Sequence, residues 1–124
     1  MPSERFTKAR RIRRRREFQR VFDLGPRTRG RYLTLLAAPN TEGKARLGIV
    51  ASRKLGNAVL RNRAKRLIRE VFRHGITAAE QGVDVVVIPR RELFDAAYSS
   101  LESAFQVALG RCVARLPAAA NAGH

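Results

Sequence analysis

Cysteine, histidine and acidic residues are scarce in this sequence, and each shortage excludes a kind of chemistry. The single cysteine, Cys112, cannot form an intramolecular disulfide or a zinc site of several thiolates, so we expect it in the core. The two histidines, His74 and His124, and the scattered acids show neither metal-ligand spacing nor the pairing that general acid–base catalysis uses. We therefore predict no catalytic residue and no metal site in the protein itself.

Long apolar runs are also missing. A membrane-spanning helix needs about 20 consecutive apolar residues, and no run in the sequence approaches that length. Residues 1–16 are rich in arginine but are not followed by the apolar stretch of a secretory signal. We therefore expect no membrane partner and a cytoplasmic location.

Positive charge, by contrast, is present in excess. The 124 residues include 26 Lys and Arg against 10 Asp and Glu, which gives a formal net charge of +16 at pH 7. Like charges at this density repel one another and oppose a compact fold, so a polyanionic partner is the natural explanation. With 44% hydrophobic residues, the chain is long enough for one compact domain and too short for two. We predict a single domain that binds nucleic acid.

Composition divides the chain into three parts. Residues 1–13 are basic and have little to bury, so we expect a flexible N-terminal arm. Residues 14–116 are predicted to form the single RNA-binding domain. The Ala-rich residues 117–124 lack anything to pack and predict a disordered tail.

Hydrophobic periodicity predicts three helices. Apolar residues recur at helical spacing over residues 14–24, 57–74 and 99–116. In the last of these, Ser99 and Glu102 match a capping box, which favours a helix that begins there.

Apolar runs at 32–38, 47–52 and 83–88 are typical of strands. Residues 39–43 favour a turn, so we expect the first two strands to form an antiparallel hairpin. The order helix, strand, strand, helix, strand, helix predicts an α+β fold, a split α/β sandwich in which helices cover a small sheet.

The helix at 57–74, with Asn57 as its expected N-cap and Gly75 at its C-cap, has two contrasting faces. Its apolar residues fall on one side of the helical wheel: Leu60, Ala64, Leu67, Ile68 and Val71. The opposite side and its flanks are cationic or polar: Arg61, Asn62, Arg63, Lys65, Arg66, Arg69 and Arg73.

A solvated helix face is the alternative interpretation of this cationic surface. Such a face normally interleaves acids with bases at i, i+4, whereas this one has a single acid, Glu70, near its edge. Arg53 and Lys54 add two cations just before the helix N-terminus, where free backbone N–H groups favour phosphate oxygens. The pattern favours a surface that grips a phosphate backbone.

The segment from Arg46 to Phe72, RLGIVASRKLGNAVLRNRAKRLIREVF, resembles the signature of the bacterial ribonuclease P protein family, whose motif is named for the central Arg61-Asn62-Arg63. The resemblance extends over most of the chain. Residues 16–22 are similar to the family's first helix, and residues 84–89 with the helix after them are similar to its last strand and helix.

This resemblance implies a division of labour. In this family an RNA subunit binds Mg²⁺ and cleaves the 5′ leader from precursor tRNA, while the protein binds both RNAs and holds no cofactor of its own. Phe18 and Phe22 would face the leader, Arg46 and Asn57 would hold the motif's architecture, and the connection into the last strand would be a left-handed βαβ crossover. The residues expected to contact the catalytic RNA are Arg53, Lys54, Arg61, Asn62, Arg63, Lys65, Arg66 and Arg69.

Two other functions remain open at this point. A ribosomal or nucleoid protein would explain the charge equally well. A self-sufficient nuclease would need clustered acids to hold metal, and Asp23, Asp84 and Asp95 are widely spaced. Phe18 and Phe22, one helical turn apart, are equally compatible with packing in the core.

Overall fold

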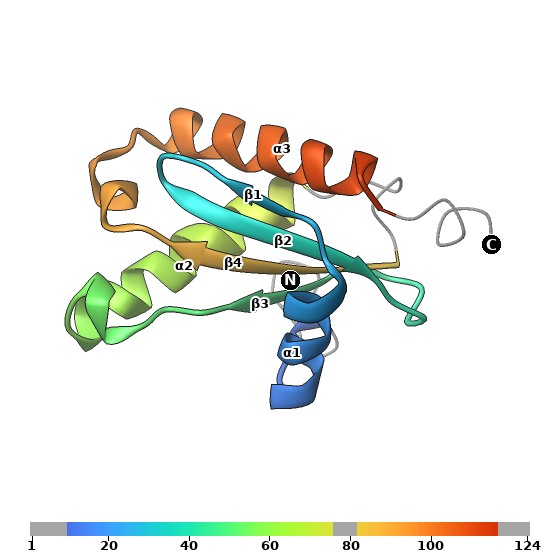
Figure 1. Ribbon diagram of the computed structural model, residues 1–124. Helices are drawn as coiled ribbons and strands as arrows, with labels where there is room; N and C mark the ends of the chain where they lie inside the picture. The colour runs from blue at the N-terminus through green and yellow to red at the C-terminus, as the bar shows by residue number, and fades with distance from the viewer. Residues whose placement is uncertain (1–9, 76–81, 117–124) are drawn as a thin grey trace, which may run out of the picture.

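The structure is a computed structural model that describes residues 10–75 and 82–116. Three helices and four strands follow one another along this part of the chain (Figure 1). In chain order they are α1 (Arg15–Leu24), β1 (Arg27–Arg29), β2 (Leu33–Pro39), β3 (Arg46–Ile49), α2 (Ala58–Gly75), β4 (Val83–Pro89) and α3 (Tyr98–Ala114). The predicted α+β class is confirmed.

The four strands form one mixed sheet in the order β1-β2-β4-β3. β4 pairs antiparallel with β2 and parallel with β3, so it lies between the two strands that we expected to form a hairpin. The hairpin prediction is wrong because burial, not the intervening turn, decides the pairing. β2 and β4 are buried along nearly their whole length and occupy the centre, while the shorter β3 carries the partly exposed Arg46 at one edge.

The other edge is β1, which the sequence did not predict. Its three residues are Arg-Thr-Arg, and they pair antiparallel with Thr34, Leu35 and Leu36 of β2. A strand this short and polar carries no hydrophobic alternation from which it could be recognised.

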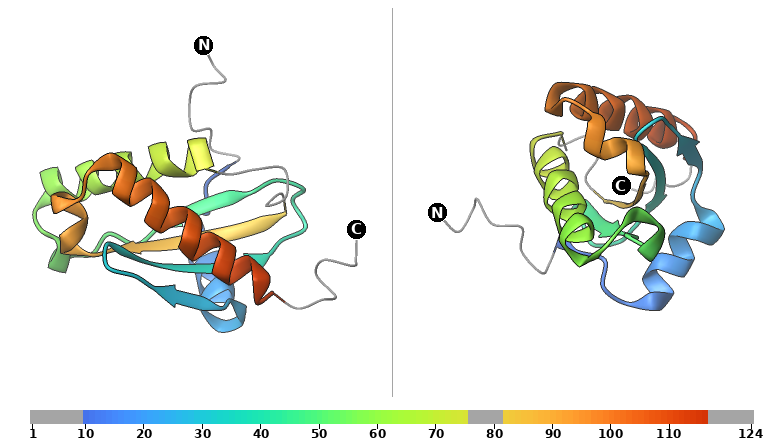
Figure 2. Two further views of the ribbon diagram at one scale, coloured as in Figure 1. Left: turned by 90° about the horizontal axis from the view of Figure 1, so that it is seen from above. Right: turned by 90° about the vertical axis from the view of Figure 1, so that its left-hand side faces the viewer.

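Two apolar layers enclose the sheet. α2 and α3 cover one face, where the ring of Phe72 meets that of Phe105 edge to face at a centroid distance of 6.3 Å (Figure 2). Cys112 is fully buried in this layer, as predicted. α1 lies across the opposite face, where Val21 packs against Leu36 and Val86. The two faces of the sheet are therefore available for different tasks.

The β3–α2–β4 unit is a parallel crossover connection. In Figure 1 both strands run from right to left, β4 lies above β3, and α2 lies behind the sheet. This arrangement makes the crossover left-handed, as the family resemblance implies, whereas about 98% of such units are right-handed.

The helix ends agree only partly with the sequence signals. The Oδ1 atom of Asn57 accepts the backbone N–H of Leu60 at 3.0 Å, which confirms the N-cap. Gly75 is the last residue of α2, and its carbonyl accepts a hydrogen bond from Gln106 of α3. The capping box at Ser99 is wrong, because α3 begins at Tyr98 and Ser99 already lies within the helix.

Part of the expected N-terminal arm packs on the domain. Arg11 forms a parallel bridge with Leu47, and the backbone N–H of Ile12 donates to the Leu47 carbonyl at 2.9 Å. The Ile12 side chain is buried in the α1 layer, so Arg11 and Ile12 are fixed beside the edge strand β3. The rest of the expected arm, residues 1–9, and the expected tail, residues 117–124 with His124, lie outside the described residues.

Candidate nucleic-acid interface

The residues predicted to bind RNA lie on one continuous stretch, the 3-10 turn Arg53–Leu55 and the outer face of α2. The apolar face of α2 is buried against the sheet and α3, which turns the cationic side chains outward. The exposed members are Arg53, Lys54, Asn62, Arg63 and Arg66, and the partly buried ones are Arg61, Lys65 and Arg69.

The turn before α2 depends on Gly56. Its φ of 143° lies in a region that other residues rarely adopt, and a Cβ atom there would come within 2.6 Å of Leu60 Cδ1. The guanidinium of Arg61 donates to the Gly56 carbonyl at 3.1 Å and closes the turn. Arg53 and Lys54 are thereby held beside the first turn of α2.

The charge on this face is largely uncompensated. Glu70, the one acid of α2, pairs with Arg73 and, at 3.1 Å, with the exposed His74, and this hydrogen bond to His74 is the chief cause that lowers the pKa of Glu70. Within residues 10–75 and 82–116, Lys65 and Arg69 form no ion pair with a carboxylate. Burial, and then the positive charge of Arg11, lower the pKa of Arg69. Positive charges held this close together favour an anionic partner.

The second predicted site, Phe18 and Phe22, lies on α1. Both rings are partly buried and pack against the layer formed by Val21 and its neighbours, as do the partly buried Val50, just after β3, and Ile88 of β4. The two rings are therefore neither fully buried nor fully exposed. They provide an apolar surface that is half open to solvent.

Gly48 on β3 permits the close approach of α1. A Cβ atom at this position would lie 2.5 Å from Cε1 of Phe18, so any larger residue would displace the ring. Phe18 also lines a small recess of about 140 Å³ at the β3 edge together with Arg11, Lys65 and Arg69. The structure thus brings Phe18 together with two of the predicted RNA-binding cations, whereas Phe22, Arg53 and Lys54 do not line this recess.

A buried ion-pair network fixes α1 to the sheet. Arg46 donates two hydrogen bonds of 2.8 Å to the carboxylate of Asp84 on β4, and a third of 3.2 Å to Glu17 on α1. Asn40 donates to the same Asp84 carboxylate at 2.7 Å. The hydrogen bonds from Arg46 to Asp84 are the main cause that raises the pKa of Arg46 above its usual range. Arg46 therefore has the architectural role that the resemblance implies.

Glu17 also caps α1. Its Oε1 atom accepts the backbone N–H groups of Arg13 and Arg14 at 3.2 and 3.1 Å. Burial raises the pKa of Glu17, but these N–H groups and the Arg46 guanidinium outweigh it, so the pKa lies below its ordinary value. Sequence reasoning missed Glu17 and Asp84 as members of the network, although a lone aspartate in the apolar run 83–88 was a usable signal.

Comparison with known proteins identifies the family. A family model described as Ribonuclease P matches residues 6–113. The chain is 42% identical over 91 residues to the ribonuclease P protein component of Thermotoga petrophila, covering 73% of this chain and 78% of that one. It is 37% identical over 101 residues to the ribonuclease P protein component of Dehalococcoides mccartyi, with 82% of each covered.

Solved structures agree. The RNase P protein from Thermotoga maritima has a TM-score of 0.65 at 36% identity, over 75% of this chain and 88% of that chain. The Staphylococcus aureus RNase P protein has a TM-score of 0.67 at 35% identity, over 86% and 94%. The chain belongs to the ribonuclease P protein family.

Membership of the ribonuclease P protein family disfavours the ribosomal or nucleoid protein that the sequence had left open as an alternative. The match to the family spans every predicted site residue, from Phe18 to Arg69. In the two described ranges, no helix combines the length and apolar character that crossing a membrane requires. The same residues contain no group of three or more His, Cys, Asp or Glu placed to hold a metal ion.

Proposed function

We propose that this chain is the protein subunit of ribonuclease P, and that it binds the catalytic RNA and the 5′ leader of precursor tRNA in the cytoplasm to support 5′ maturation. The observation that carries this proposal is the recess at the β3 edge. There the cationic face of α2, through Lys65 and Arg69, meets the half-open aromatic surface of α1, through Phe18. The cationic face of α2 thus lies next to the aromatic surface of α1.

The α2 face suits a structured RNA backbone. Guanidinium groups match phosphate oxygens in a bidentate geometry, and the exposed Arg53, Arg63 and Arg66 are free of carboxylates within the described residues. Contacts of this kind carry affinity without reading sequence. We assign this face to the catalytic RNA.

The α1 surface suits an unpaired strand. Bases stack on aromatic rings at about 1 to 3 kcal/mol per base whatever their identity, which fits a factor that serves many precursors. Phe18 and Phe22, each partly exposed beside Val50 and Ile88, offer ring surface of this kind. We assign them to the leader.

Catalysis is assigned to the RNA subunit, together with the Mg²⁺ that it requires. The carboxylates of Glu17, Glu70 and Asp84 are each engaged by arginine, which leaves them poorly suited to act as bases or metal ligands. The protein's part is to neutralise phosphates and so lower the divalent metal concentration at which the RNA folds and cleaves.

Reconstitution tests the proposal. The protein freed of RNA should cleave no precursor, and adding it to a ribonuclease P RNA should lower the Mg²⁺ concentration needed for cleavage. Cleavage by rigorously RNA-free protein would refute the assignment.

Substitution of the rings tests the leader site. Phe18→Ala and Phe22→Ala should weaken binding of leader-bearing precursor to the holoenzyme and leave the affinity for mature tRNA and the melting temperature nearly unchanged. Tyr98→Ala is the matched control, because Tyr98 is an exposed aromatic on α3, which covers the other face of the sheet. Equal losses of affinity for precursor and mature tRNA would indicate that both rings have a structural role and do not bind the leader.

A further inference from the structure

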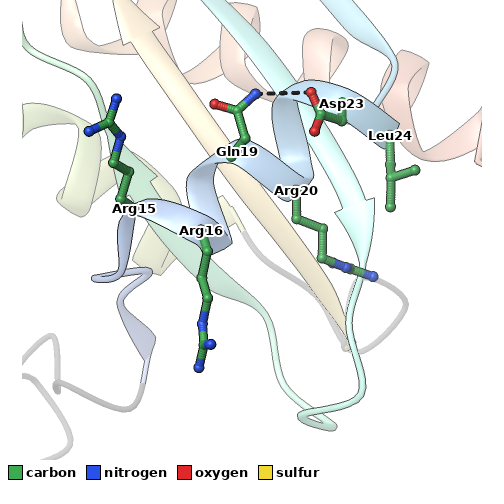
Figure 3. A pocket seen from close by; sticks show the side chains of 6 residues that line it. All are labelled: Arg15, Arg16, Gln19, Arg20, Asp23 and Leu24. Carbon is green, nitrogen blue, oxygen red and sulfur yellow. Dashed lines mark hydrogen bonds between the residues drawn. The ribbon is translucent and has the colours of Figure 1, made fainter.

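The outer surface of α1 carries a charged patch that neither predicted site uses. Arg15, Arg16 and Arg20 project from the helix beside Gln19 and Asp23 and line a shallow, open depression with them (Figure 3). Arg15 and Arg16 point away from the sheet and Arg20 reaches only the end of β2 at Pro39, whereas Phe18 and Phe22 pack against the layer on the sheet (Figure 3). We call Arg15, Arg16 and Arg20 the outer α1 patch.

The electrostatics of this patch oppose the helix that carries it. Arg15 and Arg16 lie in the first turn of α1, where the positive end of the helix dipole disfavours cations. Arg16 and Arg20 are like charges at i, i+4, which also destabilise a helix. An anion bound over the patch would offset both costs, each of which is below about 1 kcal/mol.

Within the described residues, neither acid of α1 forms an ion pair with an arginine of the patch, although Asp23 lines the same depression. Glu17 is turned toward Arg46 and the sheet, and Asp23 accepts a hydrogen bond from Gln19 at 2.9 Å. Within the described residues, Arg15, Arg16 and Arg20 form no ion pair. Among the described residues, these three arginines form one hydrogen bond, from Arg20 to the Pro39 carbonyl, and all three are exposed.

The position of α1 decides which polyanion fits. α1 and α2 lie on opposite faces of the sheet, so the outer α1 patch is separate from the outer face of α2 that we assign to the catalytic RNA (Figure 2). A flexible single strand whose bases lie at Phe18 and Phe22 is already beside α1. An α-helix with its side chains is about 10 to 12 Å across, so the next nucleotides of that strand can pass over α1.

We propose that the outer α1 patch binds backbone phosphates of the 5′ leader beyond the nucleotides that stack on Phe18 and Phe22. This inference rests on the proposed function, since it needs a leader at α1. It makes α1 a helix with two RNA-binding sides, one for bases and one for phosphates. Long leaders should then bind more tightly than short ones.

The test compares two double variants in the reconstituted holoenzyme. Arg16→Gln/Arg20→Gln removes two charges from the patch. Arg111→Gln/Arg115→Gln, at the C-terminal end of α3, is the matched control, because each pair combines an exposed arginine with one that donates to a backbone carbonyl, Pro39 for Arg20 and Arg27 for Arg115. Both are measured with precursors whose leaders have about 4 and about 16 nucleotides, the range that single-stranded sites span in other proteins.

For the long leader, Arg16→Gln/Arg20→Gln should reduce the slope of log affinity against log salt by about 1.4, since each phosphate contact to a single strand contributes about 0.7. The short leader and mature tRNA should show the wild-type slope, as should the control variant with every RNA. Arg16→Gln alone should reduce the slope by half as much. Because this variant removes no hydrogen bond within the described residues, it tests the patch even if loss of the Arg20 contact alters folding.

Two results would overturn the inference. An unchanged slope for the long leader would show a solvated patch. An equal reduction for long leader, short leader and mature tRNA would place the contact in the RNA subunit or the tRNA body. The proposed function fails separately, if the wild-type holoenzyme does not distinguish leader-bearing precursor from mature tRNA at all.

Discussion

Removal of the Asp84 carboxylate should strongly destabilise the fold. Asp84 is 1% exposed, and three hydrogen bonds of 2.7 to 2.8 Å join it to Arg46 and Asn40. Asp84→Ala leaves the Arg46 guanidinium, whose side chain is 13% exposed, with Glu17 as its remaining carboxylate at 3.2 Å. Breaking one partner of a buried pair costs about 3 to 5 kcal/mol. Because Glu17 remains, we expect the lower part of that range, about 3 to 4 kcal/mol.

The assay is urea unfolding of the isolated protein at neutral pH, followed by far-ultraviolet circular dichroism. Asp95→Ala is the control: Asp95 is exposed, so its substitution should change the unfolding free energy by less than about 0.5 kcal/mol. The double variant Arg46→Met/Asp84→Leu should recover most of the loss, because no uncompensated charge stays buried. A loss below about 1 kcal/mol in Asp84→Ala would refute the claim that this network holds α1 to the sheet.

Three further predictions concern the acid dependence of Glu17, RNA binding by α2 and the burial of Cys112. The fold lowers the pKa of Glu17 from its ordinary value of 4.5, so the ionised carboxylate contributes its full stabilisation above pH 4.5 and loses it as the pH falls through the lower, folded pKa. Glu17→Gln should remove this part of the acid dependence of the unfolding free energy, as measured in urea. Arg66→Ala and Arg69→Ala should each reduce the log–log salt slope of RNA binding by roughly 0.7 to 0.9, and two unchanged slopes would indicate a solvated face. Burial raises the pKa of Cys112, so a thiol reagent should label it only in denaturant; rapid labelling of the native protein would contradict its placement.

Much of this architecture could be predicted from local pattern. The two faces of α2 and its N-cap at Asn57 follow from a 3.6-residue period and a capping side chain, both of which are encoded within a few neighbouring residues. The α+β class follows from the order of such elements. These features are confirmed because no distant part of the chain is needed to form them.

Other features that sequence reasoning missed depend on distant residues, unlike the short polar strand β1. Arg46 and Asp84 are separated by 38 positions, and nothing in either neighbourhood pairs them. The order of the strands depends on which of them is buried on both faces, and this is decided only when the helices have packed. For the same reason, the half-open environment of Phe18 could not be distinguished from a core position: the helical spacing is identical, and only Gly48 across the sheet determines how far the ring enters.

The insertion of β4 between β2 and β3 also governs the order in which the protein can be assembled. Before β4 leaves the ribosome, the strands of the described preceding chain can pair only as β1 with β2, while β3 has the single bridge from Leu47 to Arg11 and still lacks its partner strand β4. The cationic helix α2 is therefore synthesised in full while the surface that buries its apolar side does not yet exist. High contact order of this kind slows folding and prolongs the exposure of apolar surface. A nascent chain in that state presents both its charge and its unburied core to the polyanions around it, so RNA is available to it before the fold is complete.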